Sequence, residues 1–216
     1  MDAGGEPLVP VGHADLALIL ALDGSASVTF DEFNLMAGAM GAALHDPEVA
    51  AGLTGGAAGA SLCRLLLWSG TGAQQAMTDW TRIADAASAE AFAQAVQDVP
   101  RSVRAGSTAI GEALLACERM LGEVSAARRV IDMIGDGRSN EGVRPEPARD
   151  RLAAAGVTIN GLCVLHEEPD LLQSYTDEVI GGPGAFTLPC PTYDAFADAM
   201  RRKLLREIAG RRTWRA

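Results

Sequence analysis

The sequence predicts an α/β fold of the doubly wound type, in which a mostly parallel central sheet is flanked by helices on both faces. Short apolar runs alternate with longer segments of helical periodicity along the 216 residues, as in repeated β-α units. Residues 16–22 are apolar at every position, which is typical of a strand covered on both faces. No internal repeat or second-domain boundary is evident. We therefore expect a single domain over residues 14–210, preceded by a flexible segment, 1–13, and followed by a basic tail, 211–216.

The first half of the chain begins with the apolar strand and a well-marked helix. Thr29 and Glu32 have the spacing of a capping box, and Phe33, Met36 and Met40 form an apolar stripe behind them. A Gly/Ala-rich connection then precedes the second strand, and Ser88 is a suitable N-cap for a later helix. The expected elements are a strand at 16–22, a helix at 30–44, a strand at 63–68, a short edge strand at 75–77 and a helix from Ser88 to about 99.

The second half continues the alternation. Pro145 suits the first turn of a helix, and Gly156 suits the position just after its end. Glycines at 181, 182 and 184 mark a turn before the last strand. The expected elements are a helix at 108–122, a strand at 130–134, a helix from Pro145, a strand at 157–165, a helix at 169–179, a strand at 185–188 and a helix at 193–209.

Composition and charge exclude several classes of function. The net charge of −10 argues against general affinity for nucleic acid. No apolar run approaches the roughly 18 residues that a membrane span requires. The N-terminus lacks the basic and apolar regions of a secretory signal, so the sequence as given predicts a cytoplasmic protein. A periplasmic or secreted protein is expected instead if a signal peptide has been removed.

Reactive side chains are scarce. Lys203 is the only lysine, so neither a phosphate-binding loop nor a Schiff-base lysine near the strand ends is available. Residues 200–216 hold seven basic side chains and one acid, which favours a solvated helix face over a docking tail. The cysteines have no paired zinc spacing and are expected to be buried free thiols, with a disulfide left open for Cys190. They are Cys63, Cys117, Cys163 and Cys190.

Oxygen-bearing side chains follow three of the predicted segments. Asp23, Ser25 and Ser27 come directly after the first strand, Thr108 opens a helix, and Asp136 follows the strand at 130–134. Parallel strands end at the same edge of a sheet, so these loops can converge there. Carboxylates and hydroxyls are the ligands that Mg²⁺ prefers, with Mn²⁺ and Ca²⁺ as alternatives. The sequence therefore predicts a divalent metal site with one coordination position open to solvent.

The three segments resemble the metal-ion-dependent adhesion site (MIDAS) of von Willebrand factor type A (vWA) domains. The family's Asp-x-Ser-x-Ser motif matches Asp23, Ser25 and Ser27, its threonine falls on Thr108, and its later Asp-Gly pair begins at Asp136. The resemblance spans residues 16–209 and implies a Rossmann-like three-layer fold. It also implies that the serines and the threonine contact the metal directly, and that the two aspartates bind directly or through water.

Further stretches resemble an uncharacterised bacterial family within the vWA superfamily, whose members are often exported and for which no enzymatic activity is implied. These stretches are residues 129–132, 156–162 and 179–186. The leading hypothesis is therefore a non-enzymatic module that binds an Asp or Glu of a protein partner through the cation. Arg138 and Glu141 flank Asp136 and are candidates for the partner-binding rim.

Two other classes of function stay open. Ser25, Asp136 and His166 occur in the chain order of the catalytic triad of α/β-hydrolases, although the nucleophile elbow Gly-x-Ser-x-Gly is absent. An aspartyl phosphatase using Asp23 is weaker, because it needs an acid two residues later and a better-placed lysine than Lys203. A scaffold with a purely structural metal site is the third alternative.

Overall fold

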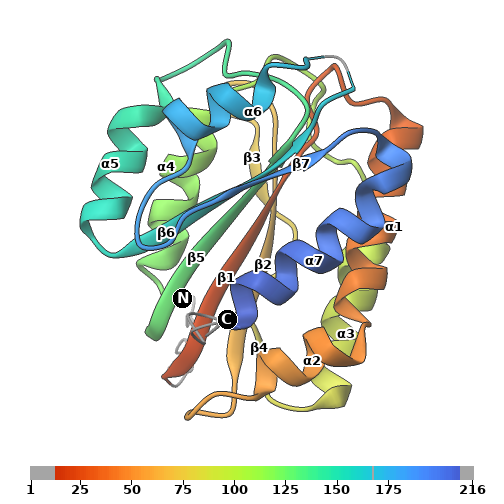
Figure 1. Cartoon of the computed structure of the whole chain (residues 1–216), viewed down its shortest axis with the longest axis vertical. Helices are drawn as coiled ribbons and strands as arrows, with labels where there is room; N and C mark the ends of the chain where they lie inside the picture. The colour runs from red at the N-terminus through yellow and green to blue at the C-terminus, as the bar shows by residue number, and fades with distance from the viewer. Residues whose placement is uncertain (1–12, 167, 210–216) are drawn as a thin grey trace, which may run out of the picture.

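A computed structural model of the chain describes residues 13–166 and 168–209 and contains a seven-stranded sheet in the order β3-β2-β1-β5-β6-β7, with β4 also paired to β2 (Figure 1). Neighbouring strands are parallel except for β3 and β4, which run antiparallel to β2. The predicted fold class is confirmed. The strands are β1 (Ala14–Asp23), β2 (Ser61–Trp68), β3 (Gln74–Ala76), β4 (Thr81–Ile83), β5 (Ala126–Gly135), β6 (Val157–Val164) and β7 (Thr187–Cys190).

Helices cover both faces of the sheet (Figure 1). One face carries α1 (Phe30–Leu44), α2 (Pro47–Thr54), α3 (Ala86–Gln97) and α7 (Phe196–Ala209). The other carries α4 (Ile110–Leu121), α5 (Pro145–Ala154) and α6 (Leu171–Ser174), which continues as a π-helical turn, Tyr175–Val179. A short 3₁₀ turn, Tyr193–Ala195, leads into α7. None of the described helices is long and apolar enough to cross a bilayer.

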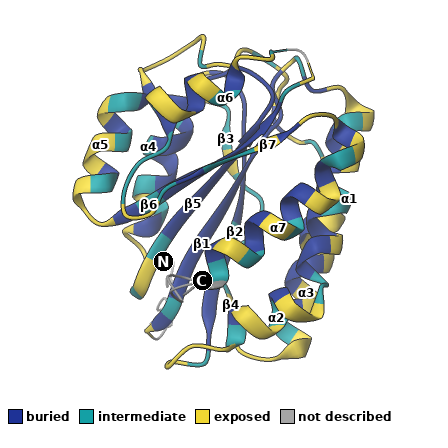
Figure 2. Ribbon diagram, viewed as in Figure 1, coloured by how far each residue is buried: buried dark blue, intermediate teal, exposed yellow. Residues whose placement is uncertain are grey.

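The first strand explains why the core has two halves. Leu18, Leu20 and Leu22 pack into the core beneath α1, α3 and α7, whereas Ile19 and Ala21 pack into the core beneath α4 and α5. Each of these side chains has no exposed surface, and Figure 2 shows the central strands buried along most of their length. An uninterrupted apolar run is therefore required, since neither face of β1 meets water.

Local signals were mostly interpreted correctly, with differences at the ends of elements. Thr29 and Glu32 form the predicted capping box of α1, and Gly156, just after α5, has a φ of 78° that glycine adopts without strain. Ser88 is not an N-cap: Asp85 caps α3, and Ser88 is the third helical residue of the same capping box. The last strand lies at Thr187–Cys190 instead of 185–188.

The structure also contains elements that the sequence did not predict. Helix α2 (Pro47–Thr54) is capped by Asp46 and runs into the expected Gly/Ala-rich connection at residues 52–59. The three-residue β4 pairs with the beginning of β2. All four cysteines are buried and free, which excludes a disulfide within the described chain for Cys190. The flexible segment and basic tail predicted at the two ends lie outside the described residues, apart from His13.

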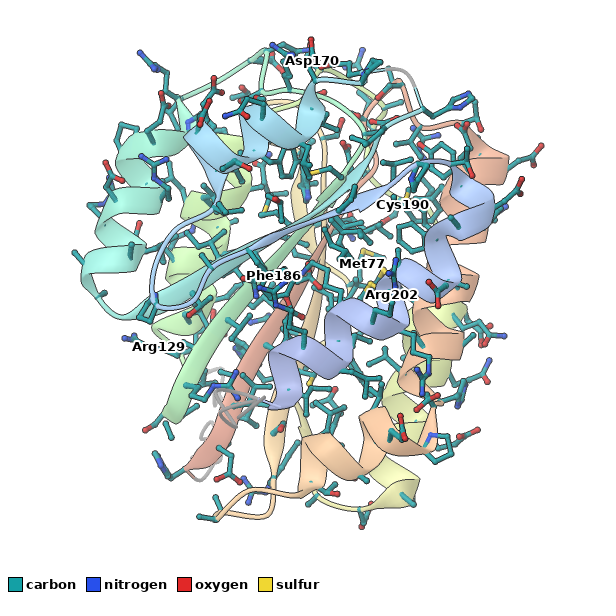
Figure 3. All side chains as sticks on the ribbon, in the orientation of Figure 1. Met77, Arg129, Asp170, Phe186, Cys190 and Arg202 are labelled. Carbon is teal, nitrogen blue, oxygen red and sulfur yellow. The ribbon has the colours of Figure 1, made fainter. Side chains whose placement is uncertain are left out.

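The prediction of a solvated basic face at the C-terminus was wrong for Lys203. Its side chain is fully buried beneath α7 and forms ion pairs with Asp132 of β5 and, at 2.5 Å, with Glu207. Asn160 of β6 donates a 2.8 Å hydrogen bond to the same oxygen of Glu207. Phe186, labelled beside α7 in Figure 3, lies 5.4 Å from the ammonium by its ring centroid. The buried charges therefore tie α7 to the centre of the sheet.

This buried group of charges has one more carboxylate than ammonium. Burial, reinforced by the neighbouring Glu207, raises the pKa of Asp132 to about 8, although Lys203 acts in the opposite direction. A carboxyl group in an apolar core ionises only at the cost of its lost hydration. The free energy of unfolding therefore depends on the protonation of Asp132. Lys203 provides the positive charge that offsets the cost of burying this carboxyl group.

We expect Lys203→Met to destabilise the protein strongly. The variant leaves two buried carboxylates without a counter-charge, a change that typically costs about 3–5 kcal/mol of unfolding free energy. Urea denaturation followed by circular dichroism measures it. Arg202→Met is the matched control, because Arg202 is exposed on the same helix and pairs only with exposed Asp198; its cost should stay below about 1 kcal/mol. Equal losses in both variants would contradict this role for Lys203.

Asp132→Asn should change how stability depends on pH. The folded-state pKa of Asp132, about 8, lies above its ordinary value of 3.8, so its stabilising contribution is complete below about pH 4 and is lost as the pH rises through 8. The wild type should therefore lose stability relative to the variant between pH 5 and pH 8, by at most about 1.4 kcal/mol per pH unit. Denaturation at several pH values, with Asp198→Asn as control, checks this. Parallel curves for wild type and Asp132→Asn would refute it.

Candidate metal centre

Loops from separate parts of the chain meet at the carboxyl edge of the sheet, the upper end in Figure 1. They enclose a cavity of about 310 Å³. The cavity contains the predicted residues Ser27, Thr108 and Asp136, one from each of the three predicted segments. The residues that line it are Ala26, Ser27, Gly106, Ser107, Thr108, Asp136, Gly137, Asn140 and Glu168.

Hydrogen bonds connect the first segment to the third. Asp23 Oδ1 accepts a 2.7 Å bond from the backbone N–H of Ser25, which folds the loop back on the end of β1. The hydroxyls of Ser25 and Ser27 lie 3.1 Å apart, and Ser27 Oγ donates to Asp136 Oδ1 at 2.7 Å. Four of the five predicted ligands thus form one continuous hydrogen-bonded chain.

Thr108 is brought to this group by backbone contacts of its own loop. Its N–H donates to Asn140 Oδ1 at 2.8 Å, and its carbonyl accepts from the N–H of Asn140 at 2.9 Å. A further 2.8 Å bond joins the N–H of Ala26 to the carbonyl of Gly106. Thr108 is 5% exposed, and its hydroxyl makes no hydrogen bond within the described chain. That oxygen is therefore available to a ligand in the cavity.

Tyr193 is a member of the site that the sequence did not predict. Its hydroxyl, at the beginning of the 3₁₀ turn before α7, donates to Asp136 Oδ2 at 3.0 Å. Asp136 thus accepts from a serine on one oxygen and a tyrosine on the other, which fixes its orientation. Burial raises the pKa of Tyr193, so the phenol is a proton donor here. No spacing in the sequence connects it to a residue 57 positions away.

The site has excess negative charge. Asp23 is fully buried, and its Oδ2 has no hydrogen-bond partner among the residues that the structure describes. Burial and then the charge of Asp136 raise the pKa of Asp23 to about 7. Arg101 lies close by, but its Nη2 donates to the carbonyls of Gly24 and Ser25, at 3.0 and 2.6 Å. An unpartnered buried carboxylate oxygen beside hydroxyls fits a small divalent cation, which would offset both negative charges.

Within the described residues, no group of three or more His, Cys, Asp or Glu side chains could hold a metal ion. A cation at this edge of the sheet therefore has to use hydroxyl oxygens. Ser25, Ser27 and Thr108 offer them, and two of the three already lie within hydrogen-bonding distance of each other. The composition of the donor set favours a hard ion over a soft one.

The remaining predicted residues lie around the cavity. Arg138 forms a 3.1 Å ion pair with Glu168. Glu141 Oε2 accepts from the N–H of Thr71 at 3.1 Å, on the loop between β2 and β3. His166, the third member of the hydrolase alternative, packs edge-on against Tyr193, with ring centroids 6.2 Å apart. Ser25 contacts Ser27, and within the described chain it makes no hydrogen bond with His166, so the Ser–His pair of the hydrolase alternative is not assembled.

Comparison with known structures identifies the fold as that of vWA domains. Proximal thread matrix protein 1 from the mussel byssus superposes with a TM-score of 0.66 at 14% identity, covering 91% of this chain and 47% of that one. A von Willebrand factor type A protein from Catenulispora acidiphila gives 0.64 at 16%, covering 90% and 43%. The vWF domain of the pilus tip protein Mfa5 from Porphyromonas gingivalis gives 0.60 at 9%, covering 88% and 94%.

A second structure of the mussel protein has a zinc-occupied MIDAS motif and superposes with a TM-score of 0.62 at 18% identity, covering 90% of this chain and 46% of that one. This chain spans less than half of the mussel and Catenulispora chains. No functionally curated protein matches it. Among family models, that described as protein of unknown function DUF1194 matches residues 13–212, and the chain belongs to this family.

Proposed function

We propose that this protein is a non-enzymatic binding module that holds a divalent cation at a MIDAS and uses it to bind an acidic residue of a protein partner. The observation that carries the proposal is the hydrogen-bonded chain from Asp23 through Ser25 and Ser27 to Asp136, with Thr108 in the same cavity. The unpartnered Oδ2 of Asp23 supports it further, because a buried carboxylate oxygen requires a counter-charge.

The proposed ligands divide by chemistry. Ser25, Ser27 and Thr108 bind the ion through hydroxyl oxygens, and Asp23 and Asp136 bind directly or through water. Ser27 donates its proton to Asp136, which leaves its lone pairs free to bind the cation. Two carboxylates balance one divalent charge, and Mg²⁺ is the expected ion, with Mn²⁺ or Ca²⁺ as alternatives.

The open coordination position of the proposed cation faces the cavity, and the partner supplies the group that fills it. Neutral hydroxyls supply little charge, so a cation bound by them remains electrophilic and attracts a further carboxylate. The cavity of about 310 Å³ admits an Asp or Glu side chain from a partner. Arg138, with half of its side chain exposed, and Glu141 are the rim residues nearest to the approaching surface. The vWA-fold neighbours include a pilus tip protein, which is consistent with a role in protein binding.

The first test is metal uptake. Isothermal titration calorimetry with Mg²⁺ and Mn²⁺ should find one site per chain, and Ser27→Ala should weaken it more than about tenfold because a ligand and the hydrogen bond that orients Asp136 are both lost. Ser107→Ala is the matched control, since Ser107 lines the same cavity and is not a proposed ligand. Absence of metal uptake by the wild type, or equal uptake by Ser27→Ala, would overturn the metal site.

The second test is metal-dependent capture of a partner. Immobilised protein should retain a specific protein from a native lysate with Mg²⁺ present and release it with EDTA. Ser27→Ala should not retain it, whereas Ser107→Ala should. Retention that is unchanged by EDTA would show that binding does not pass through the cation. A site that binds metal and captures nothing in a metal-dependent way would support a purely structural role for the ion.

A further inference from the structure

A fourth loop reaches the cavity, and it brings a second carboxylate. Glu168 lies in the loop after β6, and among the described residues that line the cavity only Asp136 and Glu168 are acidic. The Glu168 side chain is 39% exposed, so it lies at the solvent-facing side of the cavity and not beneath it. Asp23, by contrast, is fully buried and does not line the cavity. Of the two acidic residues that do line it, Glu168 is the one nearer to solvent, because Asp136 is only 3% exposed.

Arg138 holds Glu168 in this position. The guanidinium Nε of Arg138 lies 3.1 Å from Glu168 Oε2, and the backbone N–H of the same residue faces Oε1 at 3.5 Å. Oε1 also faces the predicted ligand Thr108. A carbon placed at the Cβ position of Gly137 would lie 3.7 Å from Glu168 Oε1 and 3.6 Å from Thr108 Oγ1. Glu168 Oε1, apart from its long bond with the Arg138 N–H, and the Thr108 hydroxyl thus both lie near the same point beside Gly137.

We propose that Glu168 is the chain's own carboxylate ligand for the open coordination position of the cation, which it binds directly, and that a partner's acidic residue must displace it. This inference rests on the proposed function. The negative charges of Asp23 and Asp136 offset the two positive charges of the cation, and the guanidinium of Arg138 offsets the charge of Glu168. The site with Glu168 bound to the cation is therefore neutral. When a partner's carboxylate enters, Glu168 stays paired with Arg138 and only its bond toward the cation is lost.

The test uses Mn²⁺ with the full chain and needs no partner. Calorimetry gives the affinity, and water-proton relaxation gives the number of exchangeable waters on the bound ion. Glu168→Gln removes the charge, whereas Glu168→Asp keeps the charge and shortens the reach by one methylene. Glu118→Gln is the matched control, because Glu118 is similarly exposed, forms a similar ion pair with Arg151 at 2.9 Å and does not line the cavity.

Both Glu168 variants should bind Mn²⁺ more weakly, Glu168→Gln by about tenfold, and both should show one more exchangeable water than the wild type and Glu118→Gln. Acetate should displace that water at lower concentrations in Glu168→Gln. Weaker binding by Glu168→Gln alone, with unchanged hydration in both variants, would mean that Glu168 acts only through its charge, which overturns the inference. Unchanged affinity and hydration in both would overturn it equally, while leaving the proposed function intact. Absence of Mn²⁺ uptake by the wild type would overturn both proposals.

Discussion

The parallel pairing of β1 with β5 is the constraint on which the site depends. In this register Leu22 lies opposite Ile134, so Asp23 ends its strand beside Gly135, and Asp136 follows immediately. A Cβ at Gly135 would lie 3.0 Å from Asp23 Oδ2, closer than neighbouring groups normally approach. Register alone therefore brings two carboxylates together, and the hydrogen bond from Ser27 to Asp136 closes the arrangement across 109 residues of sequence. A shift of one residue would separate them.

The convergence of Asp23 and Asp136 could be predicted from the sequence, because the signals for their two strands are local. The apolar run before Asp23 and the strand before Asp136 mark two buried parallel strands, and parallel strands end at one edge. Long-range contacts carry no such signal. Tyr193 reaches Asp136 because of how α7 packs, and Lys203 reaches Asp132 from a segment whose composition resembles a solvated face. Short elements were missed for a related reason, since the three residues of β4 take their structure from pairing with β2.

Helix α7 contacts the end and the middle of the same strand. At its beginning, Tyr193 orients Asp136 just beyond β5, and about three turns later Lys203 pairs with Asp132 within β5. Both contacts are polar and specific in direction, unlike the apolar packing that covers the rest of this face. An apolar helix face tolerates small sliding movements, whereas a buried ion pair and an oriented phenol do not. The position of Asp136 at the candidate metal site is thus fixed by the same segment, α7 and the turn before it, that pairs with Asp132 in the core.

Two buried aspartates, Asp132 of β5 and Asp23 of β1, differ in where their counter-charge comes from. Asp132 pairs with the ammonium of Lys203, the only lysine of the chain, which it shares with Glu207, so its counter-charge comes from within the core. Asp23 has no such group, because Arg101 contacts backbone carbonyls of the loop and leaves Asp23 Oδ2 without a partner. A buried carboxylate needs either a proton or a cation, and hydroxyls arranged around a cavity open to solvent favour the cation. Lys203 therefore supplies the counter-charge in the core, whereas at the carboxyl edge the proposed cation would supply it for Asp23 and Asp136.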